Sequence, residues 1–85
     1  MYDLEIKEEG ERDLDRLDKP TARRIAKKIA WLAANFNELN AETLKGEWAR
    51  FFKLRVGDYR VMYKVLHAEK RIEIYRVRHR REVYD

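Results

Sequence analysis

The sequence predicts an α+β fold, in which an N-terminal strand and an α-helical hairpin pack on an antiparallel β-sheet. Residues 21–36 carry an apolar stripe with helical spacing. Three β-rich runs follow, at residues 50–56, 59–67 and 71–79. Because only short turns separate these runs, we expect them to pair as an antiparallel meander. A chain of 85 residues is expected to form a single domain spanning residues 1–85.

The first half of the chain is expected to supply one strand and both helices. Apolar and charged residues alternate at residues 2–7, which predicts a short strand. Residues 8–17 are polar, but Leu14 and Leu17 are spaced for one side of a short helix. Pro20 suits the first turn of a second helix, where the missing N–H is not needed. The apolar stripe of that second helix consists of Ile25, Ile29, Leu32 and Phe36.

The dipeptide Gly57-Asp58 predicts a two-residue type II′ turn between the first two β-rich runs. This turn places Arg55 opposite Arg60, and side chains then alternate between the two faces of the hairpin. The face expected beneath the helices shows Phe52, Leu54, Val56, Val61, Tyr63 and Val65. The opposite face, expected to be uncovered, shows Lys53, Arg55, Arg60 and Lys64.

The cationic face of the hairpin has two interpretations. Like charges placed opposite one another destabilise a sheet, so the cluster is either solvated and tolerated or awaits a polyanion. Arginine forks bind phosphate bidentately. The aromatic residues Phe51, Tyr75 and Tyr84 lie among the cations, and unstacked RNA bases bind to such mixtures of rings and guanidinium groups.

The last β-rich run does not alternate regularly. Ile72 and Ile74 point one way, whereas Tyr75 and Val77 would point the other way in a regular strand. Either both faces are covered there or a β-bulge shifts the phase. The sequence leaves this choice open.

The charge of the chain is unevenly distributed. Residues 1–42 hold 8 Lys and Arg against 10 Asp and Glu, whereas residues 43–85 hold 12 against 6. The second half is therefore expected to face an anion such as nucleic acid. The chain has no cysteine, no signal peptide and no membrane-length apolar run, so we expect a cytoplasmic protein with no membrane partner. No His, Asp and Glu cluster has metal-ligand spacing, and we expect neither metal nor cofactor.

Two segments, LKGEWARFFKLRVGDYRVMYKV and VRHRREVYD, resemble the RelE toxin family within the RelE/ParE toxin superfamily. The resemblance implies a toxin of a type II toxin-antitoxin system that acts as a ribosome-dependent mRNA endoribonuclease, or mRNA interferase, and so inhibits translation. The RNA 2′-hydroxyl would attack the adjacent phosphate without a metal and leave a 2′,3′-cyclic phosphate. The implied partners are a cognate antitoxin, mRNA in the ribosomal A site and ribosomal RNA.

The resemblance also implies catalytic roles. Lys53 matches a family lysine that abstracts the proton of the 2′-hydroxyl or activates it electrostatically, and neighbouring cations would favour loss of the lysine proton. Arg60 matches the arginine that holds the scissile phosphate. Arg80 best matches the C-terminal arginine that supports charge on the phosphate or the leaving oxygen. Tyr84 matches a tyrosine that orients the nucleophile or stacks on a base.

Further residues are expected to bind RNA without taking part in the chemistry. They are Arg55, Lys45, Arg78, Arg81 and Phe51. Among them Arg78 and Arg81 compete with Arg80 for the role of the C-terminal arginine. Two alternatives to a ribonuclease remain: a ParE-like toxin that inhibits gyrase, and a catalytically inactive family member that acts only as a binding module.

Overall fold

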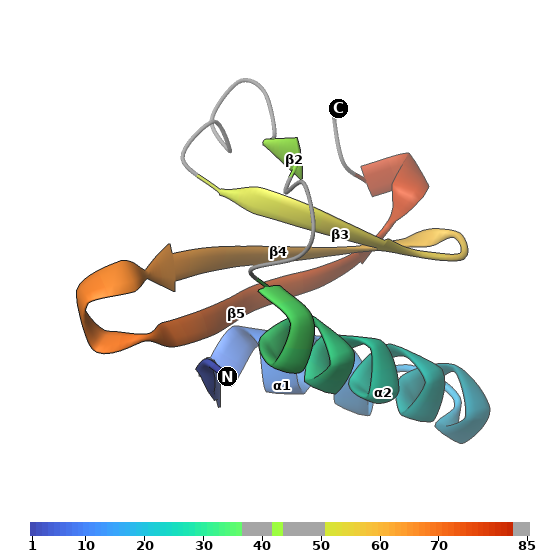
Figure 1. Cartoon of the computed structure of the whole chain (residues 1–85). Helices are drawn as coiled ribbons and strands as arrows, with labels where there is room; N and C mark the ends of the chain where they lie inside the picture. Colours follow the sequence, from blue (N-terminus) through green and yellow to red (C-terminus); the bar gives the residue numbers. More distant parts are fainter. Residues whose placement is uncertain (37–41, 44–50, 83–85) are drawn as a thin grey trace.

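The computed structural model describes residues 1–36, 42–43 and 51–82. Its elements are β1 (Asp3–Ile6), α1 (Glu8–Asp15), α2 (Lys19–Asn35), β2 (Glu42–Thr43), β3 (Phe52–Val56), β4 (Tyr59–Leu66), η3 (His67–Glu69), β5 (Arg71–His79) and η4 (Arg80–Glu82). The strands form one sheet in the order β1-β5-β4-β3-β2. Both helices lie on one side of this sheet, so the expected α+β architecture is confirmed (Figure 1).

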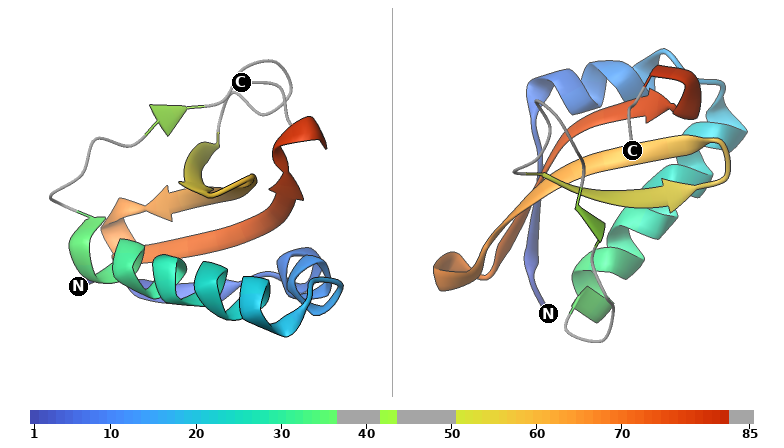
Figure 2. Two further views of the ribbon diagram at one scale, coloured as in Figure 1. Left: turned by 90° about the vertical axis from the view of Figure 1, so that its right-hand side faces the viewer. Right: turned by 90° about the horizontal axis from the view of Figure 1, so that it is seen from above.

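The two helices begin and pack as the sequence indicates. Asp18 caps the N-terminus of α2 by accepting a hydrogen bond from the backbone N–H of Thr21 at 3.1 Å, and Pro20 lies in the first turn. From their short connection the helices diverge, and α1 packs on β5 (Figure 2, right). Neither of these described helices is long and apolar enough to cross a membrane.

The hydrophobic core lies between α2 and the sheet. Tyr63 of β4 is fully buried at its centre, which raises the pKa of its hydroxyl to about 12. The buried side chains around it come from α2 and from three strands, which confirms the predicted apolar stripe and apolar sheet face. They are Ile25, Ile29, Leu32, Ala33, Leu54, Val56, Val61, Ile72, Ile74 and Val77.

The β3–β4 hairpin has the predicted register. Arg55 pairs with Arg60 and Val56 pairs with Tyr59, so Gly57 and Asp58 form the connecting turn. Gly57 has a φ of 58°, whereas the φ of Asp58 is not positive. A turn with positive φ at only its first central residue matches type II′, which favours glycine there.

The sheet contains the predicted antiparallel meander, and β1, whose pairing was not predicted, makes the sheet mixed. β3, β4 and β5 form the antiparallel meander, but β1 adds to the far side of β5 in parallel, with Leu4 opposite Ile72. The physical reason is topological: α1 and α2 separate β1 from the meander in the chain, so no tight turn forces an antiparallel neighbour. The backbone N–H of Lys7 continues this pairing by donating to the carbonyl of Ile74 at 2.8 Å.

A β-bulge resolves the irregular pattern of the last strand. Tyr63 lies opposite Ile74, whereas the preceding Met62 lies opposite Arg76, so Tyr75 is the extra residue on β5. The bulge shifts the phase of the strand. As a result Ile74 and Val77 both reach the core although they are three residues apart.

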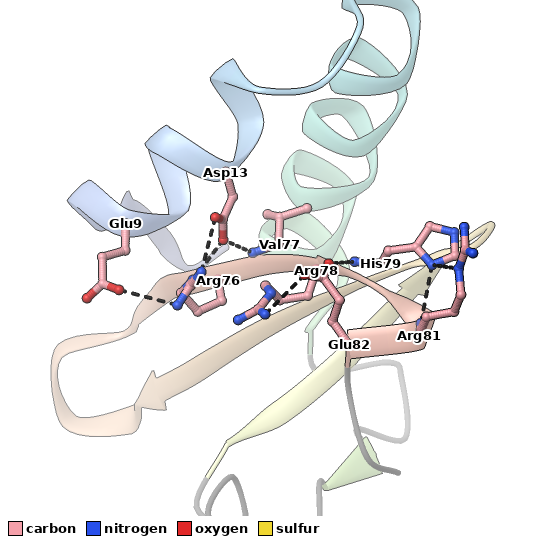
Figure 3. Close-up of polar contacts among 8 residues, drawn as sticks. All are labelled: Glu9, Asp13, Arg76, Val77, Arg78, His79, Arg81 and Glu82. Carbon is pink, nitrogen blue, oxygen red and sulfur yellow. Dashed lines mark hydrogen bonds and ion pairs between the residues drawn. The ribbon is translucent and has the colours of Figure 1, made fainter.

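Beyond the bulge, the edge of β5 is completed by a side chain from α1. β1 pairs with β5 only as far as Ile74. The carboxylate of Asp13 then accepts hydrogen bonds from the backbone N–H of Val77 and from Nε of Arg76, each at 2.8 Å (Figure 3). This contact raises the pKa of Arg76. Gly10 lets α1 approach closely, because an added Cβ would lie 3.2 Å from the carbonyl oxygen of Ile74.

We expect replacement of Asp13 by alanine to lower the free energy of unfolding by about 2–4 kcal/mol. Asp13 is only 6% exposed, so its loss leaves the N–H of Val77 without its acceptor and the guanidinium of Arg76 with only the exposed Glu9. Urea unfolding at neutral pH would measure the change. Asp15→Ala, which removes an exposed carboxylate from the same helix, is the matched control and should change stability by less than about 0.5 kcal/mol. Equal losses in the two variants would contradict this role of Asp13.

Candidate active site

The face of the sheet that turns away from α2, here called the outer face, carries the predicted site. The other face packs on α2. Because side chains alternate along a strand, the residues between the core positions of β3, β4 and β5 point to the outer face. They are Lys53, Arg55, Arg60, Met62, Lys64, Glu73, Tyr75, Arg76 and Arg78.

Three arginines form a row across the outer face. Arg55 of β3 lies opposite Arg60 of β4, which in turn lies opposite Arg78 of β5. Neighbouring strands are about 4.8 Å apart, so the register places these three residues next to one another on the same face. Nη1 of Arg60 donates to the carbonyl oxygens of Gly57 at 3.3 Å and Tyr59 at 3.1 Å, which draws this side chain toward the turn. We call Arg55, Arg60 and Arg78 the arginine row.

Lys53 lies in the adjacent row of the outer face. It pairs with Met62, and Met62 pairs with Arg76. The hairpin register thus places Lys53 on the same face as Arg60, as the sequence predicts. The expectation that this face is uncovered is wrong at this row, since Lys53 is 7% exposed and Met62 is 0% exposed. The arginine row is more accessible, because Arg55 is exposed and Arg60 and Arg78 are half-buried.

Arg78 is paired with a carboxylate from η4. Its Nη2 lies 3.1 Å from Oε2 of Glu82, and the other carboxylate oxygen of Glu82 accepts the backbone N–H of His79 at 3.1 Å (Figure 3). The hydrogen bond from Arg78 and that from the backbone of His79 lower the pKa of Glu82. A phosphate at Arg78 would therefore meet a guanidinium that already has an anionic partner.

The other two C-terminal arginines lie beyond the arginine row. Arg80 is exposed, its Nη1 lies 3.6 Å from Oδ1 of Asp58, and its backbone N–H donates to the carbonyl of Asp58 at 2.7 Å. Arg81 donates its backbone N–H and its Nε to Nδ1 of His79, at 3.2 and 3.4 Å. Of the three competing arginines, Arg78 alone pairs directly with Arg60 in the register.

Phe51 lies at the opposite end of the outer face from the arginine row. Its ring meets that of Tyr75 edge to face, with centroids 5.1 Å apart. The ammonium group of Lys64 lies 4.7 Å from the Phe51 centroid and 5.1 Å from the Tyr75 centroid. The hydroxyl of Tyr75 donates to Oε1 of Glu73 at 3.0 Å. Burial and this hydrogen bond to Glu73 raise the pKa of Tyr75.

Two predicted site residues, Tyr84 and Lys45, lie outside the described residues. Within the described ranges, no group of three or more His, Cys, Asp or Glu side chains is placed to hold a metal. The chemistry that the described side chains can supply is positive charge and hydrogen-bond donation from the arginine row and from Lys53, which lies on the same face in the register. Preorganised donors of this kind stabilise charge that develops on a phosphate.

Sequence reasoning missed the carboxylates that neutralise the cations of β5. Glu82 follows Arg78 by four residues, a spacing that pairs side chains in a helical turn, so a local signal for this contact existed. Asp13 and Arg76 are 63 residues apart in the chain. Their contact depends on how α1 packs on β5, so no local sequence pattern predicts it.

Comparisons with known proteins bear on the family and the fold of the chain. The family model of the ParE toxin of type II toxin-antitoxin systems (parDE) matches residues 4–84. Among curated proteins, none matches the chain. Several solved structures share its fold.

The toxin-antitoxin complex RelBE2 from Mycobacterium tuberculosis aligns with a TM-score of 0.80 at 24% identity, covering 92% of this chain and 90% of the other. The archaeal RelE-RelB complex from Pyrococcus horikoshii aligns with a TM-score of 0.71 at 27% identity, covering 93% and 94%. The isolated E. coli RelE toxin gives 0.75 at 18% identity, covering 93% and 84%.

We expect the stability contributed by Glu73 to depend on pH. Burial alone would raise its pKa, but hydrogen bonds from Tyr75 and Lys7, together with Arg71, lower it below the ordinary value of 4.5. A carboxylate with a lowered folded-state pKa stabilises the protein above its unfolded-state pKa, and this stability is lost as the pH falls through the folded-state pKa. Glu73→Gln should therefore cost about 1–3 kcal/mol near pH 7 and progressively less below about pH 4.5.

Urea unfolding of the wild type and of Glu73→Gln, repeated between about pH 7 and pH 3, would measure this difference. Glu69→Gln is a suitable control, because Glu69 is exposed and also pairs with Arg71, at 2.9 Å. A stability difference for Glu73→Gln that stays constant over the whole pH range would contradict the assignment.

Proposed function

This chain belongs to the family of ParE toxins of type II toxin-antitoxin systems, and we propose that it acts as a ribosome-dependent mRNA endoribonuclease. The observation that carries the proposal is the arginine row on the outer face, directly beside Lys53. Three guanidinium groups and one ammonium group on one face suit the transfer of a phosphoryl group between oxygens of RNA. The fold shared with the E. coli RelE toxin supports the same proposal.

The proposed reaction is attack of an RNA 2′-hydroxyl on the adjacent phosphate. The 2′-oxygen forms a bond to phosphorus and gives up its proton, while the bond from phosphorus to the 5′-oxygen breaks and that oxygen takes up a proton. The products are a 2′,3′-cyclic phosphate and a free 5′-hydroxyl. Lys53 receives the proton or stabilises the 2′-oxyanion, and Arg60 binds the phosphate oxygens. The ribosome would contribute by holding the mRNA in position for attack.

The position of the C-terminal arginines refines the proposed roles. Arg78 pairs with Arg60 across neighbouring strands, so it suits the second phosphate contact once Glu82 releases it. Arg80 lies at the β3–β4 turn beside Asp58, where it suits the leaving group or the next phosphate along the RNA. Arg55 extends the arginine row on β3.

The remaining predicted residues keep supporting roles in the proposal. Arg81, Phe51 and Lys45 would bind the RNA strand, and Tyr84 would orient the nucleophile or stack on a base. Several of the solved neighbours, among them the two from Mycobacterium tuberculosis and Pyrococcus horikoshii, are complexes with antitoxins. We therefore propose a cognate antitoxin as the protein partner. The cationic outer face offers a surface that an acidic segment of such an antitoxin would neutralise.

In a defined in vitro translation reaction, we expect the wild-type protein to cut mRNA only when ribosomes are present. Lys53→Met keeps the aliphatic stem but removes the ammonium group, and should lower the cleavage rate by about 10²–10⁴-fold. Arg60→Ala should lower it by about 10²–10³-fold, and Arg60→Lys should restore little, because lysine cannot bind phosphate as a fork. Primer extension would locate and quantify the cuts.

The control for this experiment is Lys19→Ala, which removes an exposed cation at the start of α2, on the side of the sheet opposite the outer face. It should cleave like the wild type. A second candidate function is inhibition of DNA gyrase, which the matching ParE family model favours. Inhibition of supercoiling by purified gyrase with mRNA left intact would support that candidate and reject the ribonuclease. Growth arrest that persists unchanged in Lys53→Met and Arg60→Ala would reject the catalytic roles.

A further inference from the structure

The β-bulge of β5 directs an aromatic ring onto the outer face. Tyr75 is the extra residue, and Arg76 after it occupies the position opposite Met62. Bulges re-aim side chains and are enriched next to active sites. Here the bulge brings the Tyr75 ring against Phe51, at 5.1 Å between centroids and an interplanar angle of 82°. We call Phe51 and Tyr75 the aromatic pair.

Buried polar contacts hold Tyr75 in this position. Its hydroxyl donates to Glu73, which is only 6% exposed. Glu73 is itself fixed by Arg71 at 3.2 Å and by Lys7 at 3.4 Å. A side chain with this support is ordered before any ligand arrives, which lowers the entropic cost of binding.

A cleft opens beside the aromatic pair. Its volume is about 700 Å³, within the range of small-molecule sites. Besides the two rings it is lined by Lys7, Glu8, Glu9, Arg12 and Arg76. Its charges alternate in sign, since Glu8 pairs with Arg12 and Glu9 pairs with Arg76 at 3.3 Å. Such a lining does not favour a bare phosphate, but its carboxylates can accept hydrogen bonds from the amino groups of a nucleobase.

We propose that this cleft binds one unpaired base of the RNA substrate, stacked on the aromatic pair and next to the linkage that is cut. The inference rests on the proposed ribonuclease function. Phe51 lies just before β3 and precedes Lys53 by two residues, so about 6.6–6.8 Å separates their Cα atoms in extended chain and the base subsite adjoins the reacting group. The ammonium group of Lys64 lies over both rings, and that of Lys7 lies 5.9 Å from the Tyr75 centroid. A stacking base would displace one of these ammonium groups, which can then contact the phosphate that flanks the base.

The test measures RNA binding without catalysis. A fluorescent RNA oligonucleotide with 2′-O-methyl groups lacks the nucleophile, so fluorescence anisotropy reports affinity alone. Tyr75→Ala and Phe51→Leu should each raise Kd by about five- to hundred-fold, the loss expected when one base loses its stacking partner. Tyr75→Phe keeps the ring but loses the hydrogen bond to Glu73, so its Kd should rise by less than that of Tyr75→Ala. Trp31→Leu, which removes an exposed aromatic residue from α2, is the matched control and should leave Kd unchanged.

A series of oligonucleotides with one abasic position separates stacking from a general effect on the protein. For the wild type, one abasic position should weaken binding by the same factor as Tyr75→Ala. For Tyr75→Ala, that abasic position should have no further effect, because the base and the ring interact with each other. Phe51→Leu provides the same comparison if Tyr75→Ala does not fold.

Several outcomes would overturn the base subsite. One is that Tyr75→Ala lowers the affinity for all oligonucleotides by the same factor, while each abasic position still weakens binding as much as it does in the wild type. Another is wild-type affinity in both aromatic variants. These results are independent of the ribonuclease assay: a wild type that cuts mRNA with no abasic effect rejects the subsite alone. If Lys53→Met cuts mRNA as fast as the wild type, the proposed reaction is rejected, but the binding measurement can still be interpreted.

Discussion

The backbone pairing of β3 with β4 is the constraint on which both the core and the candidate site depend. The turn at Gly57 and Asp58 fixes which residues face each other, and the two-residue period of a strand then assigns every side chain to a face. A slip of one residue would move Leu54 and Val61 to the outer face and bring arginines against α2. The apolar contacts of the core therefore hold the cations of the outer face together, even though like charges repel.

The strand β5 lies between β1 and β4, and it supplies side chains both to the core and to the outer face. Its bulge lets Ile74 and Val77 reach the core and leaves Tyr75 on the outer face. Each half of its far edge has a separate partner: β1 as far as Ile74, and the carboxylate of Asp13 at Val77. Completing a sheet edge in this way removes the unpaired backbone groups that promote aggregation.

What could be predicted from the sequence was local. The stripe of α2, the turn at Gly57 and the pairing of Arg55 with Arg60 follow from spacings within a few residues. The parallel addition of β1 could not be predicted in this way, because it joins segments separated by two helices. The burial of Lys53 likewise depends on what packs over the outer face, which no alternation pattern within one strand encodes. For the bulge, the sequence indicated an irregular strand, but a bulge and a strand covered on both faces were equally consistent with the same residues.

The charges of β5 limit how strongly this face can bind the proposed RNA substrate. Arg71, Arg76 and Arg78 each have a carboxylate partner within the chain, namely Glu73, Asp13 and Glu82. A phosphate that reaches Arg78 therefore replaces Glu82, and its contribution to affinity is the difference between two anionic partners of one guanidinium. Glu82 is exposed, whereas Asp13 and Glu73 are buried. An incoming strand can thus displace Glu82 at a small cost in stability, while Arg71 and Arg76 stay committed to the fold.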